Sequence, residues 1–175
     1  SIDTIDDRIA AVANGTLPAK CLTGIPKLDG ILLGLHGGDL IILAARPSVG
    51  KTAMSLAIAR NVAEANQSVL FCSLEQGERE LCERILSAAT LVAATKMRSG
   101  LLSRDEQSRI IGGFNRMVDL PMRIDDRPNQ SVLRIAATAR RMKAKTGLDL
   151  IVIDYLQLIQ PESKREPRQE QVAGI

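Results

Sequence analysis

The chain has 175 residues, 45% of them hydrophobic and 25% charged, with a formal net charge of +3 at pH 7. This length suits one α/β domain with its own core, and the sequence shows neither the ~18 uninterrupted apolar residues of a membrane span nor a secretory signal, so we expect a cytoplasmic protein. Because the charge is small and only Phe71, Phe114 and Tyr155 are aromatic, a base-stacking platform is disfavoured, and any nucleic acid would be held through its phosphates.

Residues 1–13 have the pattern of a short amphipathic helix. Four aliphatic residues fall close to one face and three aspartates lie toward the positive N-terminal end: Ile2, Ile5, Ile9 and Val12, with Asp3, Asp6 and Asp7. A helix of this length is not stable alone, so it packs either on its own domain or on a neighbouring molecule. The sequence from Asn14 to Pro18 then predicts a hinge, which separates residues 1–15 from a main domain over 16–175.

Three cysteines and one histidine limit the metal and disulfide chemistry that the chain can support. Cys21, Cys72 and Cys82 are odd in number and lack C-x-x-C spacing, which indicates reduced thiols, with Cys72 in the core. A histidine metal site or a Ser-His-Asp triad would depend on His36 alone. A surface turn before the next strand is the favoured interpretation of this histidine.

The apolar run Leu40–Ala44 predicts a buried strand that leads into the sequence Ala-Arg-Pro-Ser-Val-Gly-Lys-Thr at residues 45–52. This matches the Walker A pattern G-x-x-x-x-G-K-[ST] at every position but the first, where alanine replaces glycine. In that pattern the free N–H groups of the following helix cradle phosphate, the lysine reaches the outer phosphates and the hydroxyl ligates Mg²⁺. The alternative is a chance Gly-Lys-Thr at a helix start. The expected nucleotide-binding residues are Ala45, Arg46, Pro47, Ser48, Val49, Gly50, Lys51, Thr52 and Ala53.

A mostly buried helix is expected over residues 52–65, followed by a second strand over 68–74 that stops at Glu75. Ligands of open α/β sheets bind beyond the carboxyl ends of the strands, and Glu75 lies at such an end. Its carboxylate is suited to orient a water molecule toward a γ-phosphate. The alternative is a cap at a helix start, because the sequence Gln-Gly-Glu follows.

Three further helices are expected: Glu78–Thr90, a helix within 96–113 whose start is marked by the loose capping box Ser103–Glu106, and Ser131 to about Lys145, terminated by Gly147. The basic face of the last helix is either a DNA contact or, more commonly, solvated surface. The short segment 122–126 predicts an edge or exposed strand. Its two acids, Asp125 and Asp126, are better explained as a solvated strand end than as a metal site.

The second strong motif is the apolar run Leu150–Ile153 followed by Asp154. Such a run predicts a central parallel strand that carries a carboxylate to the same sheet edge as the phosphate loop, which is the Walker B pattern. About a hundred residues after that loop, Asp154 is the expected Mg²⁺ partner of Thr52. The following residue is Tyr155 rather than an acid, so this strand supplies no base and Glu75 remains the candidate.

Together these segments resemble the ATPase domain of replicative DnaB-type helicases over nearly the whole chain. The resemblance is carried by Thr23-Gly24 with Leu28-Asp29, by residues 38–42, 44–52 and 71–75, and by Ile151 to Leu158. The loop form Ala-Arg-Pro-Ser and the ending Asp-Tyr-Leu-Gln-Leu distinguish this family from other RecA-like ATPases, and the family is similar to this chain at Ala45. The resemblance implies an α/β fold: a RecA-like P-loop NTPase core with a mostly parallel central sheet flanked by helices.

The resemblance also implies an activity. Such proteins form hexameric rings that hydrolyse ATP or another nucleoside triphosphate between subunits, translocate on single-stranded DNA and unwind duplex at the replication fork, with a primase and a helicase loader as partners. Lys51 would bind the β- and γ-phosphates, Thr52 and Asp154 would hold Mg²⁺, Glu75 would act as base and Arg84 would lie near the nucleotide.

The same resemblance implies a division of the chain. Residues 1–15 would be a linker helix and hinge that docks on an adjacent subunit, and residues 16–175 would be the RecA-like ATPase domain. The family's sensor strand and basic finger are expected beyond Ile175, so we expect this domain to be truncated at its C-terminus.

Some interpretations stay open at this point. The polar segment 161–171 falls where the resemblance places a DNA-facing loop, with Lys164, Arg165 and Arg168 as phosphate contacts, but disordered surface explains it equally well. The alternative functions are a RecA-like repair or recombination ATPase in which ATP switches assembly, and a nucleotide-dependent interaction module that unwinds nothing. A small-molecule kinase fits less well.

Overall fold

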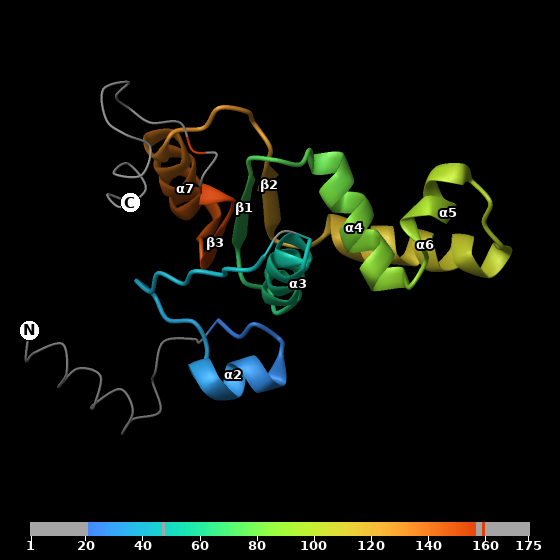
Figure 1. The fold of residues 1–175 in the computed structure, drawn as a ribbon, viewed down its shortest axis with the longest axis horizontal. Helices are drawn as coiled ribbons and strands as arrows, with labels where there is room; N and C mark the ends of the chain where they lie inside the picture. Colours follow the sequence, from blue (N-terminus) through green and yellow to red (C-terminus); the bar gives the residue numbers. More distant parts are fainter. Residues whose placement is uncertain (1–20, 47, 157–158, 160–175) are drawn as a thin grey trace, which may run out of the picture.

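The computed structural model describes residues 21–46, 48–156 and 159. In order, its elements are α2 (Pro26–Leu32), α3 (Lys51–Glu64), β1 (Val69–Ser73), α4 (Glu78–Thr90), α5 (Ala94–Ser99), α6 (Arg104–Val118), β2 (Met122–Asp125), α7 (Val132–Thr146) and β3 (Leu150–Asp154). The three strands form one parallel sheet in the order β2-β1-β3. Helices cover both faces of this sheet (Figure 1), which confirms the expected α/β fold.

The central strand β1 divides the core into two clusters. Its residues are all buried, and side chains alternate between the two faces of a strand. Val69 and Phe71 pack with apolar residues of α3 and α4, whereas Leu70 and Cys72 pack with α7. A strand that is apolar at every position requires helices on both faces, and β1 has them.

All three cysteines are free, as expected. Cys72 lies in the core, where burial raises the pKa of its thiol to about 12. Burial likewise raises the pKa of Cys21 to about 11. Both thiols are therefore protonated and unreactive at neutral pH, because the thiolate is the nucleophile.

Four helices confirm the helices expected from the sequence, and α6 runs further than expected. It continues to Val118, past Gly113, because this glycine is a packing position rather than a helix end. A Cβ atom built there would lie 2.5 Å from the Thr90 side chain of α4. Glycine thus allows α6 to pass close to α4. No helix within the described ranges is long and apolar enough to cross a membrane.

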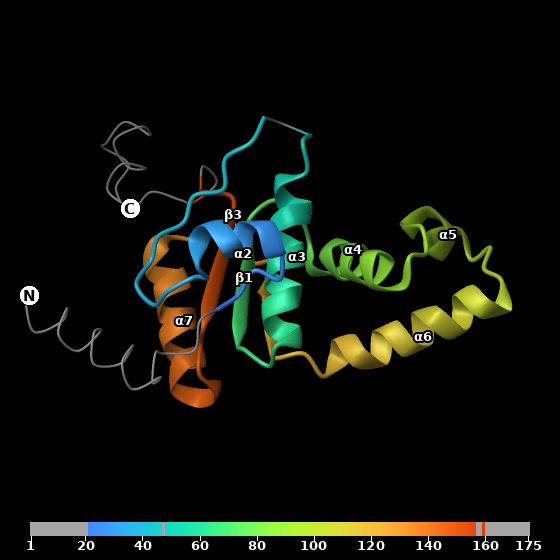
Figure 2. The ribbon, with the colours of Figure 1, turned by 90° about the horizontal axis from the view of Figure 1, so that it is seen from below.

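Residues 40–44 do not form the buried strand that the sequence predicts. They run as an extended segment outside the sheet (Figure 2), and the exposed fractions of Leu40 and Ile42 are 75% and 70%. A strand forms only where its N–H and C=O groups find a neighbour, and no described strand pairs with this segment. Apolar composition alone cannot supply that information.

The position of β3 also differs from the expectation. It was predicted as a central strand, but β1 holds that place and β3 lies at one edge of the described sheet, with Ile151 43% exposed. Both strands read as continuous apolar runs, so the sequence does not say which of the two is paired on both sides.

Asp125 corrects a further expectation. It was predicted to be a solvated strand end, but it is 5% exposed and pairs with the guanidinium of Arg127. Arg127 also donates to the Thr138 hydroxyl of α7 at 2.9 Å, and its hydrogen bonds hold the pKa of Asp125 below the ordinary range. Asp126 is exposed, as expected. The described residues contain no group of three side chains suited to a metal ion.

Several expectations fall on residues outside the described part. These are the amphipathic helix and hinge within residues 1–20, Pro47 of the phosphate loop, and Lys164, Arg165 and Arg168. They stay predictions.

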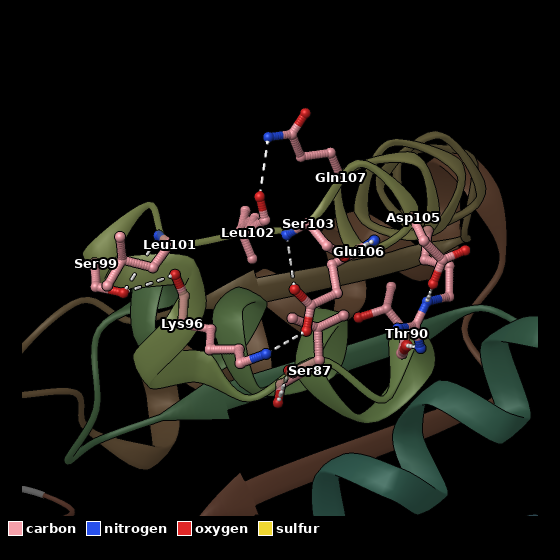
Figure 3. A network of polar contacts seen from close by, with 12 residues as sticks. Ser87, Thr90, Lys96, Ser99, Leu101, Leu102, Ser103, Asp105, Glu106 and Gln107 are labelled. Atoms are coloured by element: carbon pink, nitrogen blue, oxygen red, sulfur yellow. Dashed lines mark hydrogen bonds and ion pairs between the residues drawn. The ribbon is translucent and has the colours of Figure 1, made fainter.

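Helices α4, α5 and α6 extend away from the sheet (Figures 1 and 2), and polar contacts hold α5 and α6 together. Lys96 donates to Glu106 at 2.6 Å, and the capping box at the start of α6 is complete, with Glu106 accepting from the Ser103 N–H at 2.9 Å (Figure 3). The Ser87 hydroxyl donates to the Val92 carbonyl at 2.7 Å in the turn before α5. Surface polar contacts thus join α5 to α6, while Thr90 and Val92 of this extension are buried.

Glu106 gives this extension a pH dependence. The hydrogen bond from Lys96, followed by that from the Ser103 backbone, lowers the pKa of Glu106 from 4.5 to about 2. Because the folded pKa is the lower one, the contact stabilises the fold fully above pH 4.5 and is lost as pH falls toward about 2. An NMR titration should find the pKa of the Glu106 carboxyl well below its ordinary range, and Lys96→Met should raise that pKa. A Glu106 that titrates near 4.5 in the unsubstituted protein contradicts this prediction.

Candidate nucleotide site

The phosphate loop ends at the N-terminus of α3. Gly50 is the N-cap with φ +102°, a left-handed conformation in which glycine is unstrained, and Ser48 has φ +63°. The backbone N–H groups of Thr52 and Ala53 have no acceptor among the described residues. The helix therefore directs free N–H groups and the positive end of its dipole into the loop, which suits a phosphate group.

The loop and β3 meet through side chains. The Thr52 hydroxyl donates to Asp154 Oδ2 at 2.6 Å, and Lys51 Nζ lies 3.8 Å from Asp154 Oδ1. The side chain of Asp154 is 5% exposed, whereas that of Lys51 is 30% exposed. The structure thus brings together three of the residues predicted from the Walker A and Walker B patterns.

Tyr155 is a member of this site that sequence reasoning missed. Lys51 Nζ lies 4.1 Å from the centre of the Tyr155 ring, within the range of a cation–π contact. The sequence analysis noted Tyr155 as an aromatic residue, as part of the ending Asp-Tyr-Leu-Gln-Leu and as a residue that is not a second acid, but gave it no role in the site. The signal that could have identified it is its place directly after the Walker B aspartate, beside the carboxylate that Lys51 approaches.

Glu75 lies at the same edge of the sheet as Asp154. Ser73, the last residue of β1, is in register with Asp154, and the Leu74 N–H donates to the Asp154 carbonyl at 2.8 Å. Glu75 is the next residue, is exposed, and has no side-chain hydrogen bond or ion pair with a described residue. Its carboxylate is therefore available to a water molecule or a ligand at this edge.

For other predicted site residues the structure gives exposure or contacts away from the pair Thr52 and Asp154, and their part in nucleotide binding stays a prediction. Arg84 pairs with Glu80 at 2.8 Å on the same exposed face of α4. Ala45 and Arg46 are exposed ahead of α3. His36 lies in a turn with Asp39, where Nδ1 is 3.5 Å from the carboxylate, which confirms the surface-turn interpretation.

A second polar cluster fixes the segment before the loop. The Asp29 carboxylate accepts hydrogen bonds from the Thr23 hydroxyl at 2.7 Å and from the Thr23 and Gly24 N–H groups. Desolvation raises the pKa of Asp29, but these hydrogen bonds outweigh it and the net pKa is lowered. Asn61 of α3 donates to the Thr23 carbonyl at 2.9 Å. This segment is therefore tied to the helix that follows the phosphate loop.

The residues present fit a magnesium ion and a nucleoside triphosphate. A hydroxyl and a buried carboxylate in contact are hard oxygen ligands of the kind that Mg²⁺ prefers. The space next to Gly50 is open toward the described residues, since a Cβ atom built there meets none of their atoms within 4 Å. Lys51 and the free N–H groups of α3 supply positive charge for phosphate oxygens.

The comparisons with known proteins agree with this geometry. The chain matches the family model described as DnaB-like helicase C terminal domain over residues 21–175. The replicative DNA helicase DnaB of Leifsonia xyli subsp. xyli is 40% identical over 152 residues, which are 86% of this chain and 33% of that protein. This chain thus spans about a third of the length of that relative.

Two solved structures share the fold. An ATPase domain superposes with a TM-score of 0.91 at 28% identity, over 99% of this chain and 63% of the other. A DnaB-like replicative helicase, described with its interactions with primase, superposes with a TM-score of 0.88 at 26% identity, over 98% of this chain and 42% of the other. The expected RecA-like core is therefore confirmed.

The contact between Thr52 and Asp154 predicts a coupled effect on stability. Asp154→Ala should lower the free energy of unfolding by about 1.5–3 kcal/mol, because hydrogen bonds to charged groups contribute in that range. Thr52→Val removes the same hydrogen bond from the other side, so the double variant should cost less than the sum of the two single variants. Urea denaturation of the four proteins measures this coupling, and strictly additive losses contradict it.

Proposed function

The chain belongs to the family of DnaB-like helicase C-terminal domains, and on this basis we propose that it is the ATP-hydrolysing motor of a replicative DNA helicase. In this proposal it uses ATP or another nucleoside triphosphate with Mg²⁺, translocates on single-stranded DNA and unwinds duplex at the replication fork. The observation that carries the proposal is the contact of Thr52 with Asp154 at 2.6 Å, with Lys51 beside the same carboxylate.

The roles of the side chains follow from their chemistry. Lys51 and the N–H groups at the start of α3 bind the phosphates, within a loop that comprises residues 45–53. Thr52 and Asp154 hold Mg²⁺, which when bound neutralises charge on the phosphate oxygens. The Lys51 ammonium is near both the Asp154 carboxylate, at 3.8 Å, and the centre of the Tyr155 ring, at 4.1 Å, so both groups restrict its position.

Glu75 is the proposed base. Its carboxylate orients a water molecule and takes its proton as the water oxygen bonds to the γ-phosphorus and the bond from that phosphorus to the bridging oxygen breaks. The exposed position of Glu75 and its lack of a side-chain partner among the described residues support this role. Arg84 pairs with Glu80, so its approach to the nucleotide would require that pair to separate.

The assembly is proposed on the same basis. The open side of the site, where Val49 is 71% exposed, supports a nucleotide site completed by a neighbouring subunit of a hexameric ring. Residues 1–15 would be the linker helix and hinge of that ring, and Lys164, Arg165 and Arg168 would contact DNA phosphates. A primase, a helicase loader and a cytoplasmic location belong to the same proposal.

Hydrolysis by the full-length protein tests this function. ATP turnover should rise strongly when single-stranded DNA is added, and Glu75→Gln should lower kcat by about 10²–10⁴-fold, the usual contribution of a general base. Binding of a fluorescent ATP analogue should stay within about twofold in this variant, because glutamine keeps the size of the side chain. Glu64→Gln, at the end of α3 away from the phosphate loop and with a side chain that is 53% exposed, is the matched control and should leave turnover unchanged.

Two results would oppose the proposal in different ways. Turnover that is indifferent to DNA would favour an assembly switch or an interaction module over a motor. Turnover that survives Glu75→Gln would leave the motor intact but assign the base to another residue.

A further inference from the structure

We propose that Asp126 is a positioning residue for Glu75, holding the loop between β1 and α4 from the side opposite Asp154. The inference rests on the role of Glu75 proposed above. It concerns a carboxylate that lies at the end of β2 and that no step of the proposed reaction uses.

The start of this loop is fixed by contacts with β3 and within the turn. The Leu74 N–H donates to the Asp154 carbonyl at 2.8 Å. The Ser73 hydroxyl, on a residue that is 2% exposed, donates to the Gln76 carbonyl at 2.6 Å and accepts from the Gln76 N–H at 3.2 Å. Glu75 therefore leaves β1 in a closed turn.

The end of the loop is fixed by Asp126. Its Oδ2 accepts from the Glu78 N–H at 2.9 Å, across 48 residues of sequence. The N-cap of α4 is Gly77, which has no side chain to cap the helix, so the carboxylate that satisfies this N–H comes from Asp126, the residue after β2. A negative charge at the positive end of α4 is favourable as well. A Cβ atom added to Gly77 would lie 3.7 Å from the same oxygen, so the glycine lies directly beside Asp126.

The neighbouring residue explains how Asp126 is held in place. Asp125 is buried and pairs with Arg127, and Arg127 reaches Thr138 on α7. This contact fixes the end of β2 to the layer of helices on one face of the sheet. Asp126, the next residue, meets α4, whose residues belong to the core cluster of the other face.

The two ends of the loop decide where Glu75 lies, because its own side chain makes no hydrogen bond or ion pair with another described residue. Misplacing a catalytic group by 1 Å can cost about 10²-fold in rate. Loss of the Asp126 contact alone leaves the start of the loop fixed, so it should move Glu75 by less than about 1 Å. We therefore expect Asp126→Ala to lower kcat by about tenfold while the affinity for nucleotide changes less than twofold.

The experiment measures DNA-stimulated ATP turnover and binding of a fluorescent ATP analogue in the full-length protein. The variants are Asp126→Ala, Asp126→Asn, Glu75→Gln and the double variant of Asp126→Ala with Glu75→Gln. Asp105→Ala is the control, since Asp105 lies in the first turn of α6, in the extension, with a side chain that is 78% exposed. Asp126 is exposed too, so its truncation leaves no cavity, and thermal melting checks that each variant is folded.

The expected pattern has three parts. Asp126→Ala loses about tenfold in kcat with the nucleotide affinity retained, and Asp126→Asn, which keeps an acceptor oxygen, stays within about threefold of the unsubstituted protein. In the Glu75→Gln background, Asp126→Ala causes no further loss, because a residue that acts only through Glu75 has nothing left to position.

Three results would overturn the inference: an unchanged kcat in Asp126→Ala, the same loss in both backgrounds, or a parallel loss of affinity and melting temperature that marks a purely structural role. A normal kcat in Glu75→Gln alone would instead refute the proposed base. The Asp126→Ala variants thus test the inference, and Glu75→Gln alone tests the proposed base, within the same experiment.

Discussion

The hydrogen bond from Thr52 to Asp154 joins residues 102 positions apart, and the rest of the structure is arranged so that it can form. The hydroxyl belongs to the first turn of α3 and the carboxylate to the last residue of β3. They meet only if α3 packs on the sheet with its N-terminus above the carboxyl end of that strand. Buried apolar residues of α3 and β1, such as Leu56 and Phe71, hold the helix there. The register of the parallel strands β1 and β3, with Ser73 opposite Asp154, sets the position of the carboxylate at the end of the sheet. Hydrophobic packing therefore determines how α3 lies on the sheet, and the polar site forms at the carboxyl ends of the strands.

A buried carboxylate is costly unless it is paired, and Asp154 has its partners close by. Thr52 supplies a hydrogen bond and Lys51 supplies a nearby charge, itself next to the ring of Tyr155. The same three groups are suited to phosphate and Mg²⁺, so the contacts that make the folded site stable also place donors and ligands where a nucleotide would need them. Such an arrangement needs little reorganisation on binding, which is the physical basis of electrostatic preorganisation.

The sequence predicted those parts of the site that depend on local pattern. The proximity of Lys51, Thr52 and Asp154 could be predicted because a glycine loop before a helix and an apolar run before an aspartate each have one typical place in a parallel sheet. The start of α6 was found because Ser103 and Glu106 form a capping box. The expected strand at 40–44 and the central place of β3 were wrong because composition does not name the neighbouring strand. Asp125 was placed in solvent because its burial depends on Arg127 and on Thr138, which approaches only when α7 packs on the sheet.

The same distinction explains why Asp126 could not be recognised from its sequence. Its partner is a backbone N–H on α4, and backbone groups carry no sequence signal. Helix α4 begins at the site and ends in the extension with α5 and α6, where Arg98 with Glu83 and Lys96 with Glu106 form ion pairs near the surface. Exposed ion pairs contribute roughly 0–1 kcal/mol each. Its first turns, in contrast, contribute Leu81 and Ile85 to the buried core beside β1. The first half of α4 is therefore anchored in the core beside β1, as the proposed role of Glu75 requires.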